Sequence, residues 1–289
     1  MLNRLVRRCD LFWDACSMKH YRQEAGMNLI ANFAVLSSRR AIFDLSVCDL
    51  GWDDALVFIN ELLSIPVGQT SISFVNARKM LLSLRDSEYH AVLAQNLLLP
   101  HGPGLDFASK VAHGSPFPTS LKAVDFVPAL LTYMEVPRRI GLIGGAPEAV
   151  RTTAATFRRH APWHEFIIIS DGFSDVADKS PIVKDIDRHG LDLLIVGAST
   201  ASEEKWIHKN IRVDHARLVL AVGNLFDVVG ATVDHVPKLR RLIGLRFSYR
   251  GMQDSTRRGL QYTLGFAAFL YHVLQHGATR RKRILRRLV

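Results

Sequence analysis

The sequence alternates regularly between short apolar runs and segments with helical spacing. Helical patterns such as Asp125–Met134 and Pro147–Arg159 lie between the runs. The last four runs start roughly 27 residues apart, which is a βα repeat length. Continuous apolar runs separated by helices predict an α/β fold with a mostly parallel sheet covered by helices on both faces. The runs of strand length after Ala41 are Ser71–Val75, Leu97–Leu99, Arg139–Ile143, Phe166–Ile169, Leu191–Val196 and Leu218–Val222.

Small or polar residues follow nearly every run. Asn76, the pair Gly144-Gly145, Gly197 and Gly223 all come directly after a predicted strand. The carboxyl ends of parallel strands are where folds of this kind bind ligands. Glycines there let backbone N–H groups approach phosphates, and helix N-termini add a favourable dipole. The pattern is typical of a nucleotide-binding α/β protein.

Positive charge is concentrated at the C-terminal end. Residues 238–289 contain 13 of the 37 Lys and Arg residues and one acidic residue, Asp254. Residues 1–237 hold 24 basic and 26 acidic residues, a net charge of −2. This segregation predicts that the basic tail, residues 238–289, binds an anionic surface. The nearly neutral body, residues 1–237, would then carry a separate function. Nucleic acid, a membrane and an acidic polymer all remain open at this point.

Several classes are disfavoured by what the sequence lacks. The apolar stretch 259–274 has 16 residues, and crossing a bilayer takes about 20. Asp10 and Asp14 interrupt any signal-peptide core, and the three cysteines lack metal-ligand spacing, so we expect a cytoplasmic protein. No P-loop or nucleophile elbow occurs, and the glycines of Gly141–Gly145 lack dinucleotide spacing.

Six motifs in a fixed order carry a more specific signal. They are Asn76, Asn96–Gly104 (NLLLPHGPG), Asp125–Leu131 (DFVPALL), Gly144–Pro147 (GGAP), Val196–Ile207 (VGASTASEEKWI) and Ala221–Gly230 (AVGNLFDVVG). Together they resemble the TagA/WecG/CpsF family of bacterial glycosyltransferases over roughly residues 41–275. The resemblance implies a Rossmann-like fold and an inverting transfer of an N-acetylmannosamine-type sugar or related hexose from a UDP-sugar. It also implies a polyprenyl-diphosphate-linked acceptor in exopolysaccharide, capsule or cell-wall assembly, no metal or other cofactor, and a basic appendage that docks on the membrane.

The chain departs from the family pattern where the chemistry is expected. His101 stands where the family usually has an aspartate, and Ser120 where it usually has an arginine. Ala201, Ser202 and Glu203 replace the usual P-K-Q. Positions that match the pattern are Glu204, Lys205, Trp206, Phe226, Asp227, Gly230, Tyr249 and Arg250. An altered homologue that binds a nucleotide sugar or lipid-linked glycan without turnover is therefore the alternative to an active enzyme.

The catalytic candidates are His101, Asn76 and Asp125. An imidazole with an unperturbed pKa of about 6.5 is a competent base at neutral pH, so His101 can replace a carboxylate or serve only in binding. Asp106 and Asp125 are fallback carboxylates, and Asn76 suits either a sugar contact or a strand end. The donor candidates are Gly144, Gly145, Ala146, Gly197, Glu203, Glu204, Gly223 and Asp227. Their alternatives are plain turns and helix-terminal roles.

The acceptor and diphosphate candidates lie in the basic tail: Arg240, Arg241, Tyr249, Arg250 and Arg257. A solvated or lipid-facing cluster is the equal alternative for these arginines. An apolar stretch flanked by arginines is typical of interfacial binding, which favours an anionic cytoplasmic membrane surface over nucleic acid.

We therefore expect an N-terminal extension of unassigned role (1–40), an α/β glycosyltransferase domain (41–237) and a membrane-docking appendage (238–289). The protein would lie peripherally on the inner face of the cell membrane, and a homo-oligomer stays open.

Overall fold

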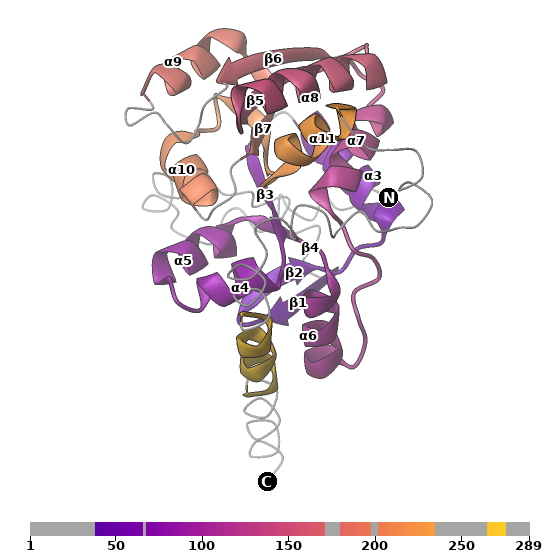
Figure 1. Cartoon of the computed structure of the whole chain (residues 1–289), viewed down its shortest axis with the longest axis vertical. Coiled ribbons are helices and arrows are strands. Elements are labelled where there is room, and N and C mark those ends of the chain that lie inside the picture. Colours follow the sequence, from indigo (N-terminus) through magenta and orange to yellow (C-terminus); the bar gives the residue numbers. More distant parts are fainter. Residues whose placement is uncertain (1–37, 66–67, 171–179, 198–201, 235–264, 276–289) are drawn as a thin grey trace, which may run out of the picture.

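One eight-stranded sheet organises the part of the chain that the structure, a computed structural model, describes: residues 38–65, 68–170, 180–197, 202–234 and 265–275. The strand order is β1-β2-β4-β3-β8-β7-β5-β6 (Figure 1). Neighbouring strands pair in parallel except β1 and β2, which are antiparallel. The strands are β1 (Arg39–Ile42), β2 (Leu45–Cys48), β3 (Thr70–Val75), β4 (Leu97–Pro100), β5 (Arg139–Gly144), β6 (Glu165–Ser170), β7 (Leu191–Gly197) and β8 (Ala216–Ala221). The predicted mostly parallel α/β fold is confirmed, and each predicted run coincides with one of β3 to β8.

The β1–β2 hairpin was not predicted. Its two turn residues, Phe43 and Asp44, have φ values of 50° and 64°, the left-handed conformation that a tight two-residue hairpin turn requires. Phe43 is 5% exposed and lies edge-on against Phe269, with ring centroids 5.6 Å apart. Burial of this ring offsets the cost of a positive φ at a non-glycine residue.

Helices cover both faces of the sheet, as the sequence predicts. One face packs against α3 (Trp52–Ser64), α7 (Ala123–Tyr133), α8 (Pro147–His160) and α11 (Leu225–Asp234). On the other face, α4 (Ala77–Ser83), α5 (Ser87–Gln95) and α6 (Pro103–His113) cover β1 to β4. The rest of that face is covered by α9 (Ser180–His189) and α10 (Ser202–Asn210). Adjacent residues therefore point into different cores: Phe74 faces α7, and Val75 faces α4.

A helix over residues 265–275 packs against the body near α4 and α6 (Figure 1, gold). Phe269 is fully buried and Val273 nearly so, in the same cluster as Met80 and Leu105. A Cβ on Gly104 would lie 2.7 Å from Ala77 Cβ and 3.2 Å from the Phe266 ring. The glycine thus allows the start of α6 to approach both α4 and the C-terminal helix.

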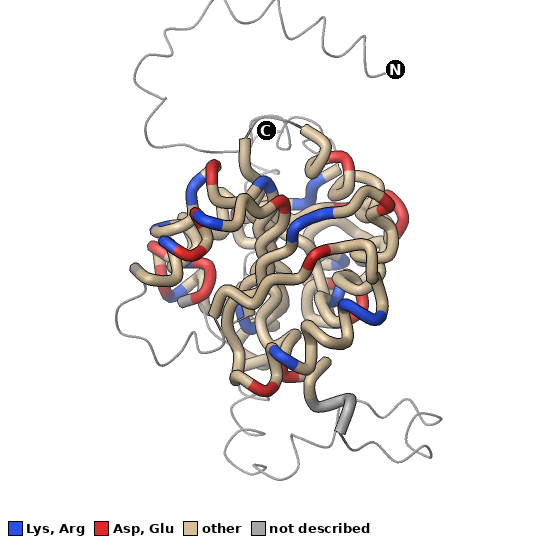
Figure 2. The backbone as a smooth tube through the Cα atoms, turned by 90° about the horizontal axis from the view of Figure 1, so that it is seen from above, with Lys and Arg blue, Asp and Glu red and all other residues tan. Residues whose placement is uncertain are grey.

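Near the middle of the sheet, the connections that leave the neighbouring strands β3 and β8 run in opposite directions across it. From β3 the chain continues through α4 and α5 to β4 on one side, whereas β8 leads into α11, which packs on α8 beside β5. Ligands of doubly wound folds bind at such reversal points, outside the carboxyl ends of the strands. Lys and Arg residues are interspersed with Asp and Glu residues over the described part of the chain (Figure 2).

Candidate functional site

Asn76 and His101 lie side by side at the carboxyl ends of β3 and β4. Val75 and Pro100 are paired in register, so the residues that follow them are neighbours. The His101 amide donates to the Val75 carbonyl at 2.9 Å, and Asn76 Nδ2 lies 3.4 Å from His101 Nε2. The structure thus brings together two of the three catalytic candidates, whose catalytic roles stay predictions.

The turn that carries His101 is held by backbone and hydroxyl contacts. Ser120, at the position of the usual arginine, accepts a hydrogen bond from the Gly102 amide at 3.0 Å. The Leu121 amide donates to the Pro100 carbonyl at 2.8 Å. Gly102 has a φ of 89°, which favours glycine, and the following Pro103 opens α6. Ser120 thus braces the turn instead of supplying a cation.

Burial, followed by the nearby ammonium groups of Lys79 and Lys122, lowers the pKa of His101 from 6.5 to about 4. The imidazole is therefore neutral at physiological pH. Its proton affinity is close to that of the aspartate usual at this position, whose unperturbed pKa is about 3.9. The environment gives the imidazole the base strength of a carboxylate without the negative charge.

A buried ion pair lies beside this dyad. Lys79 Nζ pairs with Glu204, a carboxylate with no exposed surface. Glu203, equally buried, accepts a hydrogen bond from the Gly223 amide at 3.2 Å through Oε1. Burial and the charges of Glu204 and Glu203 also raise the pKa of Tyr89. These contacts link α4, α10 and the turn after β8 around the carboxyl edge of the sheet.

Lys205 completes the attachment of α10, binding Asp86 at 2.8 Å and also Glu88. The helix begins at Ser202, and both glutamates belong to its first turn. Trp206 is 8% exposed and packs in the apolar cluster with Ile207.

The glycines on the other side of the sheet surround one aromatic ring. Gly144 and Gly197 are paired between β5 and β7. A Cβ on Gly197 would lie 2.5 Å from the Phe226 ring, and one on Gly145 would lie 3.3 Å from it. Gly144 and Gly145 have φ values of 99° and 77°, so the turn before Ala146 and α8 favours glycine for backbone reasons as well. Packing around Phe226 thus accounts for two of the predicted donor residues without a ligand.

The remaining candidates are more scattered. Asp227 is half-buried in the first turn of α11, and Asp125 is exposed in the first turn of α7. Asp106 lies in the first turn of α6, where burial raises the pKa of its carboxyl. The five tail residues Arg240, Arg241, Tyr249, Arg250 and Arg257 lie outside the described residues.

Sequence reasoning missed Lys79 and Lys122. Lys79 falls one helical turn after Asn76, so a helix beginning at Ala77 returns it to the same side. Lys122 directly precedes α7, two residues after Ser120. The helical periodicity was a usable signal for Lys79, but its pairing with Glu204 joins residues 125 positions apart.

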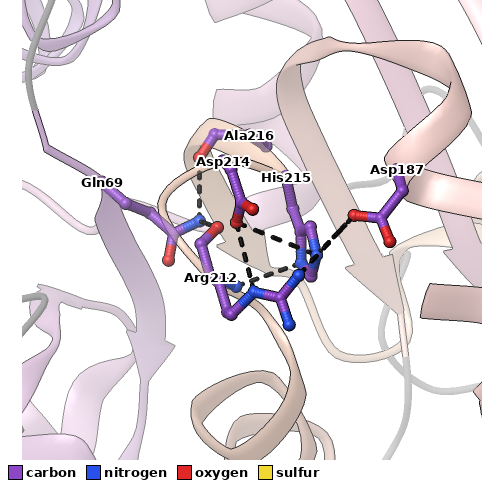
Figure 3. A network of polar contacts seen from close by, with 6 residues as sticks. All are labelled: Gln69, Asp187, Arg212, Asp214, His215 and Ala216. Atoms are coloured by element: carbon purple, nitrogen blue, oxygen red, sulfur yellow. Dashed lines mark hydrogen bonds and ion pairs between the residues drawn. The ribbon is translucent and has the colours of Figure 1, made fainter. Parts of the chain in front are cut away.

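The described residues also contain a group of side chains with the spacing of metal ligands: Asp187, Asp214 and His215 (Figure 3). It lies at the amino end of β8, away from the carboxyl edge. His215 Nε2 is 2.8 Å from Asp187 Oδ1, and Arg212 Nε is 3.3 Å from Asp214 Oδ1. The Arg212 amide donates to His215 Nδ1 at 3.1 Å, so the imidazole proton sits on Nε2. A metal would need that nitrogen free, so the group fits an ion-pair network better than a metal site.

No helix among the described residues is both long and apolar enough to cross a membrane. The fold and the carboxyl-edge residues define an α/β protein of the ligand-binding, doubly wound type. Residues 40–283 match the family described as Glycosyl transferase WecG/TagA/CpsF family, and the chain belongs to it. It is accordingly a glycosyltransferase, as the motifs predicted.

One curated relative is the N-acetylglucosaminyldiphosphoundecaprenol N-acetyl-beta-D-mannosaminyltransferase of Bacillus subtilis (strain 168). It is 25% identical to this chain over 181 residues, which cover 62% of this chain and 70% of the relative. The resemblance inferred from the motifs is therefore confirmed at the level of the family.

Proposed function

We propose that the protein is an inverting transferase that moves an N-acetylmannosamine-type sugar or related hexose from a UDP-sugar to a polyprenyl-diphosphate-linked acceptor. The relative's name supports the acceptor class and the sugar class. Within the structure, the supporting observation is the neutral His101 beside Asn76 at the carboxyl ends of β3 and β4. The product would serve exopolysaccharide, capsule or cell-wall assembly.

In the proposed reaction, His101 is the general base. The acceptor hydroxyl oxygen attacks the anomeric carbon of the donor while the bond from that carbon to the UDP oxygen breaks. The bonding electron pair leaves with UDP, and the hydroxyl proton passes to the imidazole, which later releases it to solvent. Gly144, Gly145 and Ala146, at the turn before α8, offer backbone N–H groups to the donor. We assign no metal to this reaction.

Membrane association is proposed for the basic segment 238–289. Within it, the helix over 265–275 buries Phe269 and leaves Phe266, Tyr271 and Leu274 exposed. An exposed apolar face within a segment whose sequence is rich in arginine suits the interface of an anionic bilayer, where each basic residue near the surface contributes about 1 kcal/mol. This would bring the carboxyl edge of the sheet to a lipid-linked acceptor.

The test is UDP release from UDP-N-acetylhexosamines with a polyprenyl-diphosphate-GlcNAc acceptor. Since a general base contributes about 10²- to 10⁴-fold, His101→Ala should lower kcat at least about 100-fold. His101→Asp should retain much more activity than His101→Ala, because its carboxyl has a similar proton affinity. Full turnover by His101→Ala would remove His101 from the base role.

The substitutions at His101 and Ser120 support one other candidate, a homologue that binds without turnover. Binding of UDP to the wild-type protein, with no UDP release from any of these donors, would favour that candidate over the transferase.

A further inference from the structure

A short chain of hydrogen bonds connects the start of α4 to the imidazole of His101. The Lys79 amide donates to Asn76 Oδ1 at 3.1 Å, so Asn76 is the N-cap of α4. This bond fixes the orientation of the Asn76 side chain, since a flipped amide would set its NH₂ group against another donor. Nδ2 therefore faces His101 Nε2, at 3.4 Å.

This orientation decides which nitrogen of His101 carries the proton. An amide Nδ2 can only donate, so Nε2 must present its lone pair, and the proton of the neutral ring lies on Nδ1. Two buried histidines have the opposite arrangement. His164 Nδ1 accepts from the Arg138 amide at 3.2 Å and its Nε2 lies 2.9 Å from the Leu131 carbonyl, whereas His215 Nδ1 accepts from the Arg212 amide. Both of these rings must carry the proton on Nε2.

We propose that Asn76 is a positioning residue that holds His101 as the Nδ1–H tautomer and thereby keeps the Nε2 lone pair as the atom that accepts the substrate proton. The proposal deepens the proposed function and rests on it. The acceptor hydroxyl would donate to Nε2, sharing it with or displacing the long contact to Asn76 Nδ2. Transfer of the hydroxyl proton then gives an imidazolium with hydrogens on both nitrogens.

The charges around His101 make the choice of an amide at position 76 important. The cationic groups that face the ring are Lys79 on α4, which is paired with Glu204 of α10, and Lys122 before α7. Both lysines oppose protonation of the ring. A carboxylate at position 76 would do the reverse, because it accepts from Nε2–H and stabilises the imidazolium. An asparagine caps the helix without that effect.

Two substitutions separate capping from tautomer control, because Asp and Ser both cap helices about as well as Asn. Asn76→Asp keeps the cap but exchanges donor and acceptor in the contact with His101, because a carboxylate accepts a hydrogen bond from Nε2–H. Asn76→Ser keeps the cap and removes the contact. A role confined to capping α4 predicts that both variants behave like the wild type.

The measurement is the long-range ¹H–¹⁵N spectrum of the full chain labelled at its histidines, with His101 assigned from the spectrum of His101→Gln. We expect Nδ1–H for His101, against Nε2–H for His164 and His215 as internal references. Asn76→Asp should move the proton to Nε2 and raise the pKa of His101 by about one unit or more, since a close opposite charge shifts pKa values by 1–3 units. An Nε2–H signal for His101 in the wild type, or an unchanged tautomer and pKa in Asn76→Asp, would overturn the proposal.

Kinetics provide a second readout. The acid limb of the kcat profile should move to higher pH in Asn76→Asp. The kcat at neutral pH should also fall, because Nε2 then carries the proton and has no lone pair for the acceptor hydroxyl, while thermal stability stays near that of the wild type. An unmoved limb would contradict the proposal. An Nδ1–H signal for His101 combined with no turnover of any donor would refute the proposed function and leave the tautomer assignment standing.

Discussion

At the scale of single residues, Gly197 shows how packing and ligand binding can call for the same amino acid. Its position after β7 suggests a backbone contact to a donor phosphate. In the structure, the space that its Cβ would occupy is filled by the ring of Phe226, 2.5 Å away. Phe226 itself is 1% exposed and cannot move without opening a cavity.

Gly197→Ala should therefore destabilise the protein by about 1–3 kcal/mol, the usual cost of overpacking a core. The loss should shrink when Phe226→Leu is added, because the shortened side chain frees the space for the new methyl group. Chemical denaturation of the two single variants and the double variant measures this coupling.

Gly265→Ala is the matched control, because no atom of the described residues lies within 4 Å of its added Cβ and an alanine favours the helix. If Gly197→Ala keeps full stability and loses only UDP binding, the glycine serves the donor and not the packing.

At this scale, His101 shows which features of the candidate site can be predicted from the sequence and which cannot. Its position at the tip of a turn after a strand identified it, and its neighbour Asn76 followed from the same rule. The lysines that lower its pKa were not evident, since Lys79 and Lys122 come from two separate elements. Side-chain contacts of this kind depend on how helices are placed over the sheet.

At the scale of elements, the start of α10 is fastened by three successive residues. Glu203 binds the turn after β8, Glu204 pairs with α4, and Lys205 pairs with α5. Both glutamates are fully buried, whereas Lys205 and its partner Asp86 are partly exposed. These contacts hold together the two halves of the sheet at its carboxyl edge.

Breaking the Lys79–Glu204 pair should be costly. Lys79→Met or Glu204→Gln should each lower the free energy of unfolding by about 3–5 kcal/mol, because either change leaves one buried polar partner uncompensated. Lys79→Met combined with Glu204→Leu should cost much less than the sum, since both charges are then removed. Urea denaturation of the single and double variants gives the coupling energy.

Lys205→Met is the control on the same helix. Its partners Asp86 and Glu88 are partly exposed, so we expect a much smaller loss of stability than for Lys79→Met. If Lys205→Met and Lys79→Met lower the free energy of unfolding equally, burial of the Lys79–Glu204 pair does not increase its contribution to stability.

The elements themselves were largely predictable, and their order in the sheet was not. Strands β3, β4, β5, β7 and β8 are mostly buried and the edge strand β6 is partly buried, so all six appear as apolar runs that can be recognised without a period-two alternation. The hairpin of β1 and β2 was missed because its strands are four residues each and the turn contains neither glycine nor asparagine. The insertion of β8 between β3 and β7 is a tertiary choice that no local pattern encodes.

At the scale of the whole molecule, the charged tail and the body are less separate than the sequence suggests. The helix over 265–275 contributes Phe269 to the same core as Met80 and Leu105. It lies against the start of α6, where an added Cβ on Gly104 would be 3.2 Å from the Phe266 ring. Deleting residues 238–289 would thus remove part of the core, and lost membrane binding could not be distinguished from unfolding.

Point substitutions on the two faces of this helix avoid that problem. Phe269→Ala should lower the free energy of unfolding by about 3–5 kcal/mol, as expected for a buried aromatic residue. Tyr271→Glu with Leu274→Glu should leave thermal stability unchanged, since these side chains are 59% and 56% exposed. The double variant should bind phosphatidylglycerol vesicles more weakly in a sedimentation assay, because glutamates neither enter the interface nor tolerate an anionic surface.

The matched control carries the same change in net charge at the opposite edge of the sheet. Val136→Glu with Val213→Glu alters two exposed apolar residues on the loops before β5 and β8. We expect this control to bind vesicles nearly as well as the wild type. If both double variants lose binding equally, net charge rather than the exposed face of the helix governs association with the membrane. If neither loses binding, the membrane contact lies elsewhere in residues 238–289 or does not occur.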